Sequence, residues 1–206
     1  MPEFVLFNGP PLAGKDWGGD LLARRMLSLG YSVVIEKFSN EVKREVHRAF
    51  GLPEDPALFE HCKNQPRPEL GGLSPRQAYI NWSERIMKPL HGIDYYGRRL
   101  LANLLQNPAE IYIITDSGFE PEIRRIVEHF GPGSFSLLRI HADGADFAND
   151  SRSYIDLTHL GVRGDDVFNR KDDSYENDLI GALTAINPAF SSVFQDHSSI
   201  SMPLRA

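Results

Sequence analysis

Residues 3–16 read Glu3-Phe4-Val5-Leu6-Phe7-Asn8-Gly9-Pro10-Pro11-Leu12-Ala13-Gly14-Lys15-Asp16. The first part of this stretch is rich in apolar and aromatic residues, as in a buried β-strand. The second part matches the pattern G-x-x-x-x-G-K. Residues 15–29 then show helical spacing and end at Gly30, a frequent residue just beyond a helix. A strand, a glycine loop and a helix in this order predict a loop that binds phosphate groups.

The chemistry of such a loop comes mainly from its backbone. Glycine allows a tight turn that points successive N–H groups inward, and the following helix adds the positive end of its dipole. Lys15 supplies a point charge for the β- and γ-phosphates. The alternative interpretation is a glycine-rich turn beside a surface lysine. We expect ATP, with Mg²⁺, to contact Gly9, Pro10, Pro11, Leu12, Ala13, Gly14, Lys15, Asp16 and Trp17.

Two carboxylates are candidates for the metal side of this site. Position 16 departs from the usual pattern, which has Ser or Thr there as a magnesium ligand. Asp16 offers a carboxylate instead, kept ionised by the helix terminus and Lys15. It would bind Mg²⁺ directly, bind it through water, or accept the proton of the acceptor, and the sequence leaves these roles open. Asp116, after the strand-like segment 111–115, is the second expected metal-side carboxylate, and its position also suits a helix N-cap.

The rest of the chain alternates between strand-like and helix-like segments. Apolar, β-branched or aromatic residues mark strands at 3–8, 31–36, 111–115, 135–140 and 166–169. Helical spacing marks 15–29, 39–50, 74–88, 93–106, 119–130 and 174–186. This alternation predicts a central parallel five-stranded sheet with helices on both faces. Together with the phosphate-binding loop, it predicts a three-layer α/β fold of the P-loop NTPase class. Ligands bind such sheets beyond the carboxyl ends of the strands.

Composition narrows the class of protein. The 206 residues, 41% of them hydrophobic, suit a single domain spanning 1–206. No apolar run approaches the roughly 18 residues that a membrane helix needs, and no signal-peptide pattern is present. The single cysteine, Cys62, suits a reducing compartment, so we expect a cytoplasmic protein. A net charge of −6 argues against a broad nucleic-acid-binding surface but is compatible with a small anionic substrate.

Phosphoryl transfer needs positive charge to hold both phosphate groups. A mostly helical region at about 37–110 is expected to bind the acceptor. A polar stretch at about 141–165, rich in Gly, Asp and Ser, has the composition of a mobile lid over ATP. For each cation the alternative is a solvated surface charge. The candidates are Lys37, Lys43, Arg76 and Arg124 for the acceptor, and Arg152 in the lid.

Several short motifs occur in a fixed order along the chain. They are Gly14-Lys15-Asp16, Lys37-Phe38-Ser39-Asn40-Glu41-Val42-Lys43, Ser74-Pro75-Arg76-Gln77, Ile114-Thr115-Asp116 and Asp150-Ser151-Arg152. As an ordered set they resemble the phage-type deoxynucleoside monophosphate kinases and, more distantly, phosphomevalonate kinase. The resemblance implies a nucleoside monophosphate kinase-like fold, dependence on ATP and Mg²⁺, and a phosphate-bearing acceptor. It also implies that Arg76 contacts the acceptor's phosphate and that Arg152 lies in the lid.

The sequence also departs from this family. The loop is neutral before Gly14, Trp17 replaces a common Thr, and Gly118 stands where an arginine is frequent. The resemblance nevertheless leads us to expect a kinase that transfers the γ-phosphoryl group to a nucleotide, foremost a deoxynucleoside monophosphate. If the protein is phage-encoded, we expect it in the host cytoplasm. One alternative is a kinase that phosphorylates hydroxymethyluracil in DNA, and another is a non-catalytic nucleotide-binding regulator. The sequence also leaves open whether the chain forms a homodimer.

Overall fold

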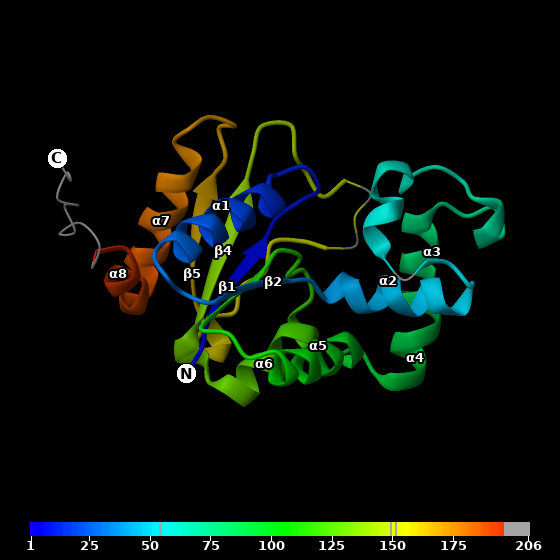
Figure 1. Ribbon diagram of the computed structural model, residues 1–206, viewed down its shortest axis with the longest axis horizontal. Helices are drawn as coiled ribbons and strands as arrows, with labels where there is room; N and C mark the ends of the chain where they lie inside the picture. Colours follow the sequence, from blue (N-terminus) through cyan, green and yellow to red (C-terminus); the bar gives the residue numbers. More distant parts are fainter. Residues whose placement is uncertain (54, 149, 151, 196–206) are drawn as a thin grey trace, which may run out of the picture. The chain divides into compact units, whose positions relative to one another are not determined.

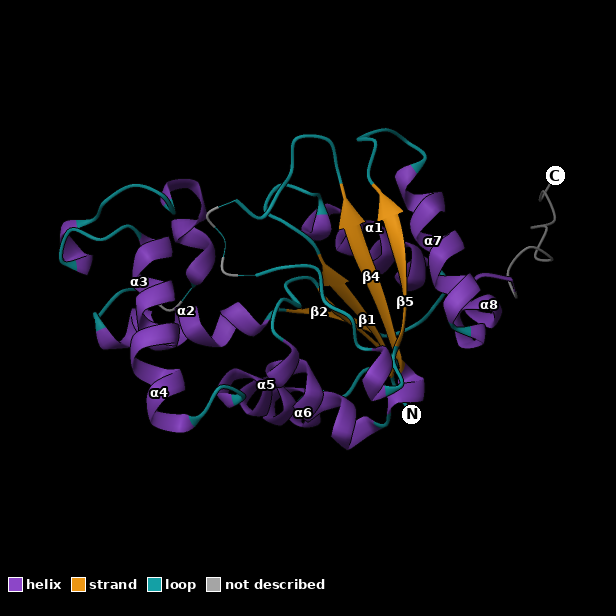
Figure 2. Ribbon diagram, turned by 180° about the vertical axis from the view of Figure 1, so that it is seen from behind, coloured by secondary structure: helices purple, strands orange, loops and turns teal. Residues whose placement is uncertain are grey.

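The computed structural model describes residues 1–53, 55–148, 150 and 152–195. Ser151 of the lid motif and the tail 196–206 lie outside the described residues. Five parallel strands form one sheet in the order β2-β3-β1-β4-β5 (Figures 1 and 2). They are β1 (Glu3–Asn8), β2 (Val33–Glu36), β3 (Ile111–Ile114), β4 (Phe135–His141) and β5 (Arg163–Phe168). The predicted α/β fold with a central parallel five-stranded sheet is confirmed.

The chain forms two compact units. The first unit contains Met1–Glu36, Ala109–Glu120 and Val127–Ala206, and therefore holds the whole sheet. The second unit contains Lys37–Pro108 and Pro121–Ile126, and it is helical.

Helices α1 (Lys15–Ser28), α7 (Tyr175–Ile186) and α8 (Pro188–Gln195) belong to the first unit. In Figures 1 and 2, α7 and α8 lie beside β5. Because strand side chains alternate between faces, Val5 and Phe7 both point to the face that these helices cover. There they pack with Leu22 and Met26 of α1 and with Leu179 of α7.

The opposite face of the sheet is aromatic. The ring of Phe4 stacks on Tyr112 with centroids 5.1 Å apart and on Phe135 with centroids 4.4 Å apart. Phe130, the last residue of α6 (Glu120–Phe130), packs on the same ring with centroids 4.8 Å apart. Helices therefore cover both faces of the sheet, and β1 lies buried at its centre.

The second unit contains α2 (Phe38–Ala49), α3 (Pro75–Asn81), α4 (Lys88–His91) and α5 (Tyr95–Gln106). Its small core is built on Val46, Leu70 and Ala78. A capping box begins α3, since Ser74 and Gln77 each accept from the other's backbone N–H. Short 3-10 helices are Pro56–Cys62 and Pro68–Leu70 in this unit and Pro132–Ser134 and Thr158–Leu160 in the first unit.

Most elements lie within two residues of the expected bounds, and three elements differ more. The helix expected at 74–88 contains a π-helical segment, Trp82–Met87, and continues through α4 to His91. Strand β5 begins at Arg163 rather than residue 166. The sequence does not predict this start, because the edge strand exposes polar side chains and so lacks an apolar pattern. Helix α8 lies in a tail that shows no periodicity. No helix in the described part of the chain is long and apolar enough to span a membrane.

Candidate active site

The loop between β1 and α1 contains two residues in the left-handed backbone region. Gly14, the N-cap of α1, has φ 91° and ψ 20°, and a Cβ atom there would lie 2.2 Å from Nδ2 of Asn169. Glycine is therefore required at this position. Leu12 has φ 66° although it carries a side chain, and that side chain is 89% exposed. Such backbone strain concentrates at ligand-binding loops.

The N-terminus of α1 has no side-chain cap at its N-cap position. The N-cap residue is Gly14, which carries no side chain that could accept from the first turn. The first N–H groups of a helix have no partner inside it, and they carry the positive end of its dipole. An anion such as phosphate accepts hydrogen bonds from these N–H groups and is attracted to the positive end of the dipole. The loop therefore fits a polyphosphate chain through its backbone.

Lys15 supplies the charge beside these donors. Its Nζ donates to the carbonyl oxygens of Gly9 at 2.7 Å and of Pro10 at 2.6 Å, so the ammonium group curls over its own loop. Burial, and after it the guanidinium of Arg152, lower the pKa of Lys15 to about 8, and the carboxylates of Asp16, Asp116 and Asp150 counteract part of this shift. A doubly anionic phosphate would restore the full charge of this ammonium.

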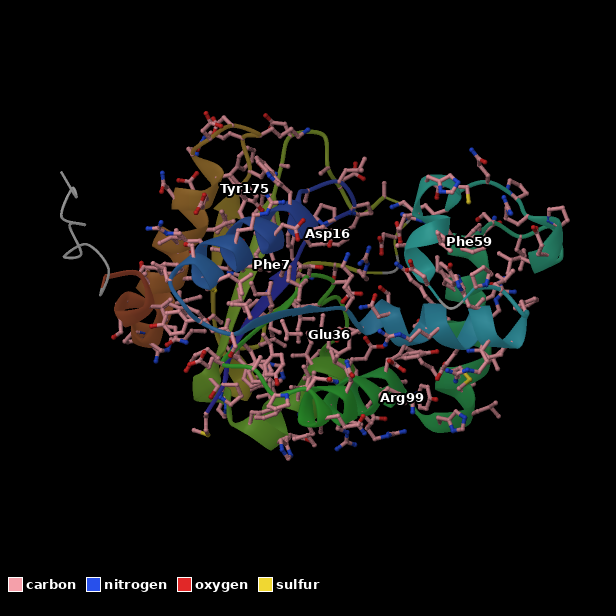
Figure 3. The ribbon with its side chains drawn as sticks, viewed as in Figure 1. Phe7, Asp16, Glu36, Phe59, Arg99 and Tyr175 are labelled. Atoms are coloured by element: carbon pink, nitrogen blue, oxygen red, sulfur yellow. The ribbon has the colours of Figure 1, made fainter. Side chains whose placement is uncertain are left out.

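Asp16 is fixed by the end of a neighbouring strand. The hydroxyl of Thr115 donates to Oδ1 of Asp16 at 2.6 Å, and Thr115 is only 1% exposed. Figure 3 shows Asp16 in the first turn of α1. Asp116 follows Thr115 directly, so the two predicted metal-side carboxylates belong to adjacent elements. Asp116 is not a helix N-cap, because α6 begins at Glu120 with Phe119 as its N-cap.

These carboxylates suit magnesium better than a metal held by protein ligands alone. The described residues contain no group of three or more His, Cys, Asp or Glu side chains that could hold a metal ion. Mg²⁺ is commonly bound by one or two carboxylates together with water and substrate phosphates. Asp16 and Asp116 therefore fit Mg²⁺ that arrives with a nucleotide.

Two residues from the C-terminal part of the chain donate hydrogen bonds to carbonyl groups of the loop. Asn169, 2% exposed, donates from Nδ2 to the carbonyl of Ala13 at 3.0 Å and accepts at Oδ1 from the N–H of Lys171. The buried hydroxyl of Tyr175 donates to the carbonyl of Gly14 at 3.4 Å. Figure 3 shows Tyr175 at the start of α7. The ring of Trp17 lies against Tyr175 with centroids 5.2 Å apart.

Arg152 belongs to the same unit as the loop. Its Nε and Nη2 donate to the two carboxylate oxygens of Asp150, at 2.8 Å and 2.6 Å. This bidentate pair, together with Asp116, raises the pKa of Arg152, which keeps its charge at every working pH. The structure thus brings together the predicted residues 9–17, Asp116 and Arg152.

The four predicted acceptor residues lie in the second unit. Arg76 is exposed in the first turn of α3, and its backbone N–H donates to the carbonyl of Lys63 at 3.0 Å. Lys43, on α2, forms an ion pair with Glu60 at 2.6 Å. Lys37 is the N-cap of α2, and Arg124 lies on α6.

The sequence pattern does not single out several residues of the site. Asn8, Thr115 and Asn169 hold the loop and its surroundings, and each stands at or just after the carboxyl end of a strand. That position is the one signal that could have found them, because ligand sites of parallel sheets form there. Their partners lie 99 to 156 residues away along the chain.

Comparison with known proteins places the chain among no family. No protein-family model and no curated protein matches the sequence. A gluconokinase from Sinorhizobium meliloti 1021 has 13% identity and a TM-score of 0.42, over 95% of this chain and 98% of its own. A sugar kinase from Janibacter sp. HTCC2649 has 14% identity and a TM-score of 0.39, over 92% and 98%. Shikimate kinase from Acinetobacter baumannii, solved with shikimate, has 16% identity and a TM-score of 0.34, over 94% and 80%. Likenesses at this level assign neither a family nor a substrate to the chain.

Proposed function

We propose that this chain is an ATP-dependent kinase that transfers the γ-phosphoryl group to a nucleotide, foremost a deoxynucleoside monophosphate. The observation that carries the proposal is the loop before α1. This loop contains the half-buried Lys15 and leads into a helix without a side-chain cap. It is followed by Asp16, which Thr115 holds through a hydrogen bond. That combination suits a bound triphosphate.

Each residue has a role that follows from its chemistry. The loop amides and Lys15 would hold the β- and γ-phosphates, and Asp16 and Asp116 would hold Mg²⁺, whose charge would offset the negative charge that develops during transfer. The acceptor oxygen attacks the γ-phosphorus, the bond to the β-phosphate oxygen breaks, and ADP leaves. Arg152 offsets charge on the transferred group.

The choice of acceptor also affects the role of Asp16. A phosphate monoester has a second pKa near 6, so its attacking oxygen already lacks a proton at neutral pH. A monophosphate acceptor therefore needs no general base, and Asp16 is left to the metal. A hydroxyl acceptor, as in a DNA base, would need Asp16 or another base to accept its proton.

A nucleotide acceptor is supported by the second unit and by the ordered motifs. Arg76 stands exposed in the capped first turn of α3, where its fork can grip a phosphate in two hydrogen bonds. The motif Ser74-Pro75-Arg76-Gln77 is the one through which the sequence resembles the deoxynucleoside monophosphate kinases.

The test is ADP release from Mg·ATP with separate acceptors, namely the four deoxynucleoside monophosphates, phosphomevalonate, hydroxymethyluracil DNA, gluconate and shikimate. We expect turnover with at least one deoxynucleoside monophosphate and none in the Lys15→Ala variant. If only another acceptor supports turnover, the chain is a kinase for that acceptor and the proposed deoxynucleoside monophosphate substrate is wrong. Tight ATP binding without any acceptor-dependent ADP release would favour a regulator and contradict the kinase.

A further inference from the structure

The segment 152–157, here called the strap, is tied to the carboxyl ends of β1 and β4. Asn8, the last residue of β1, donates to the carbonyl of Ser153 at 3.2 Å and accepts from the N–H of Ile155 at 3.1 Å. Tyr154 donates its hydroxyl to the carbonyl of Ile140 at 3.1 Å, and its ring stacks on His141 with centroids 4.3 Å apart. The strap, which lies within the stretch expected to form a lid, is therefore hydrogen-bonded to the sheet.

Asn8 also ties the strap to the turn after β3. Its Nδ2 donates to the carbonyl of Ser117 at 2.9 Å, and the N–H of Ser117 donates to the carbonyl of Phe7 at 3.0 Å. Asn8 is only 1% exposed, and its hydrogen bond to Ser117 is buried. One buried amide thus connects the central strand, the turn at Ser117 and the strap.

Gly118, the next residue of that turn, makes room for the side chain of Arg152. A Cβ atom on Gly118 would lie 2.3 Å from Cδ and 2.9 Å from Cγ of Arg152, closer than real Cβ contacts occur. The arginine stem therefore rests on bare glycine backbone. With its stem seated and its fork held by Asp150, the guanidinium acts electrostatically on both Lys15 and Asp116.

We propose that Asn8 and Gly118 are positioning residues for phosphoryl transfer, and that they act through Arg152. Asn8 fixes the backbone that carries Arg152, and Gly118 seats its side chain, so that the guanidinium is held for the γ-phosphate beside Lys15. Fixing a long side chain beforehand spares the ordering that it would otherwise need at each turnover. This inference rests on the proposed function, because it needs a triphosphate in the loop.

The experiment compares the affinities for adenylyl imidodiphosphate and for ADP, both with Mg²⁺, by calorimetry. Their ratio reports the γ-phosphate alone and needs no knowledge of the acceptor. We expect the unmodified chain to prefer the imidodiphosphate, and Arg152→Ala to reduce this preference about 10- to 100-fold. Gly118→Ala should reduce it to a similar degree, because the new methyl group displaces the stem. Asn8→Ala should lose most of it as well.

The matched control is Gly133→Ala, at a glycine of the same unit where an added Cβ meets nothing within 4 Å. It should keep the preference intact. The double variant Gly118→Ala/Arg152→Ala should lose no more of the preference than Arg152→Ala alone, because both changes remove the same interaction of Arg152 with the γ-phosphate. Gly118→Ala also keeps the test valid should Asn8→Ala fail to fold, because it touches the arginine stem and leaves the bonds of Asn8 in place.

An unchanged preference in Gly118→Ala, or fully additive losses in the double variant, would overturn the inference. An unmodified chain with no preference for the γ-phosphate would also overturn it, even if Lys15→Ala weakens ADP binding. If Lys15→Ala leaves the binding of both nucleotides unchanged, the proposed function itself fails.

Discussion

Lys15 gives the site its pH dependence. Burial is the main cause that lowers its pKa from the ordinary 10.5 to about 8. Between these values an unfolded chain keeps a proton on Lys15 that the folded chain has lost. This residue therefore makes the folded state more stable as the pH rises from about 8 to 10.5. Phosphate binding changes in the opposite sense, because a neutral amine does not attract phosphate.

We predict that kcat/KM for ATP falls as the pH rises through about 8, since this parameter reports the free enzyme, in which Lys15 has that pKa. In the Lys15→Arg variant this decline should move to a much higher pH, because arginine stays protonated. The measurement is a pH profile of both proteins. The same alkaline decline in the two profiles would show that another group titrates.

Thr115 holds Asp16, one of the two carboxylates proposed to bind Mg²⁺. The Thr115→Val change keeps the shape of the side chain but removes the donor that holds Asp16 at 2.6 Å. Partners that orient a metal-binding carboxylate matter for metal affinity, so we expect the Mg²⁺ concentration for half-maximal activity to rise about tenfold.

The control is Thr184→Val in α7, where the hydroxyl bonds only to carbonyls of its own helix. Magnesium titrations of activity compare the two variants. If Thr115→Val keeps the Mg²⁺ requirement of the unmodified chain, Asp16 acts elsewhere than at the metal.

At the scale of elements, the loop depends on the end of β5. Asn169 satisfies the buried carbonyl of Ala13, and its removal leaves that group without its partner. We predict that Asn169→Ala lowers the free energy of unfolding by about 1–3 kcal/mol and also weakens ATP binding. Thermal unfolding and calorimetry measure the two effects.

Asn187→Ala separates stability from function. Asn187 is a buried amide of the same unit that donates to Glu3 at 2.8 Å and to Ser136 at 3.2 Å, at the strand ends opposite the loop. This variant should lose stability to a similar degree while keeping its affinity for ATP. Equal losses of affinity in both variants would mean that Asn169 only stabilises the fold.

The elements differ in how well the sequence predicts them, and the reasons are physical. Strand β1 has the predicted bounds, 3–8, because Phe4, Val5, Leu6 and Phe7 form an unbroken buried apolar run in this central strand. The first half of β5 escapes prediction because its edge position lets polar side chains face solvent. Helix α8 has only a short signal, Asn187-Pro188, in which the asparagine accepts from the N–H of Ala189.

The site shows the same division. Lys15 and Asp16 are predictable because one short motif contains both the turn and the charges. Asn8 and Asn169 are not, since they act on residues 145 and 156 positions away, and only the folded sheet brings these partners together. The sequence thus predicts the groups that would contact ATP, while the supporting hydrogen bonds depend on tertiary structure.

At the scale of the whole molecule, each unit has its own centre of stability. In the second unit, Glu45 of α2 accepts from the indole N–H of Trp82 at 3.2 Å and from the hydroxyls of Tyr95 at 2.8 Å and Tyr96 at 2.9 Å. Burial and this carboxylate raise the pKa of Tyr96, which therefore stays a donor. Three helical segments are joined at one side chain.

We predict that Glu45→Gln destabilises the second unit selectively, because a single amide oxygen cannot serve three donors. Amide hydrogen exchange in α2 and α5 should accelerate about tenfold or more, while exchange in β1 and β4 stays unchanged. Glu69→Gln, at a surface ion pair of the same unit, should leave both patterns alone. Equal acceleration in both units would mean that the chain opens as one cooperative body.

The central claim is that residues 9–17 hold the polyphosphate of ATP. Calorimetric titration with Mg·ATP tests it most directly, on the unmodified chain, on Lys15→Ala and on Lys63→Ala, whose lysine forms a surface ion pair with Glu60. We predict that the unmodified chain and Lys63→Ala bind ATP alike, and that Lys15→Ala binds it at least about tenfold more weakly while staying folded. Equal ATP affinity in Lys15→Ala and the unmodified chain would contradict the account.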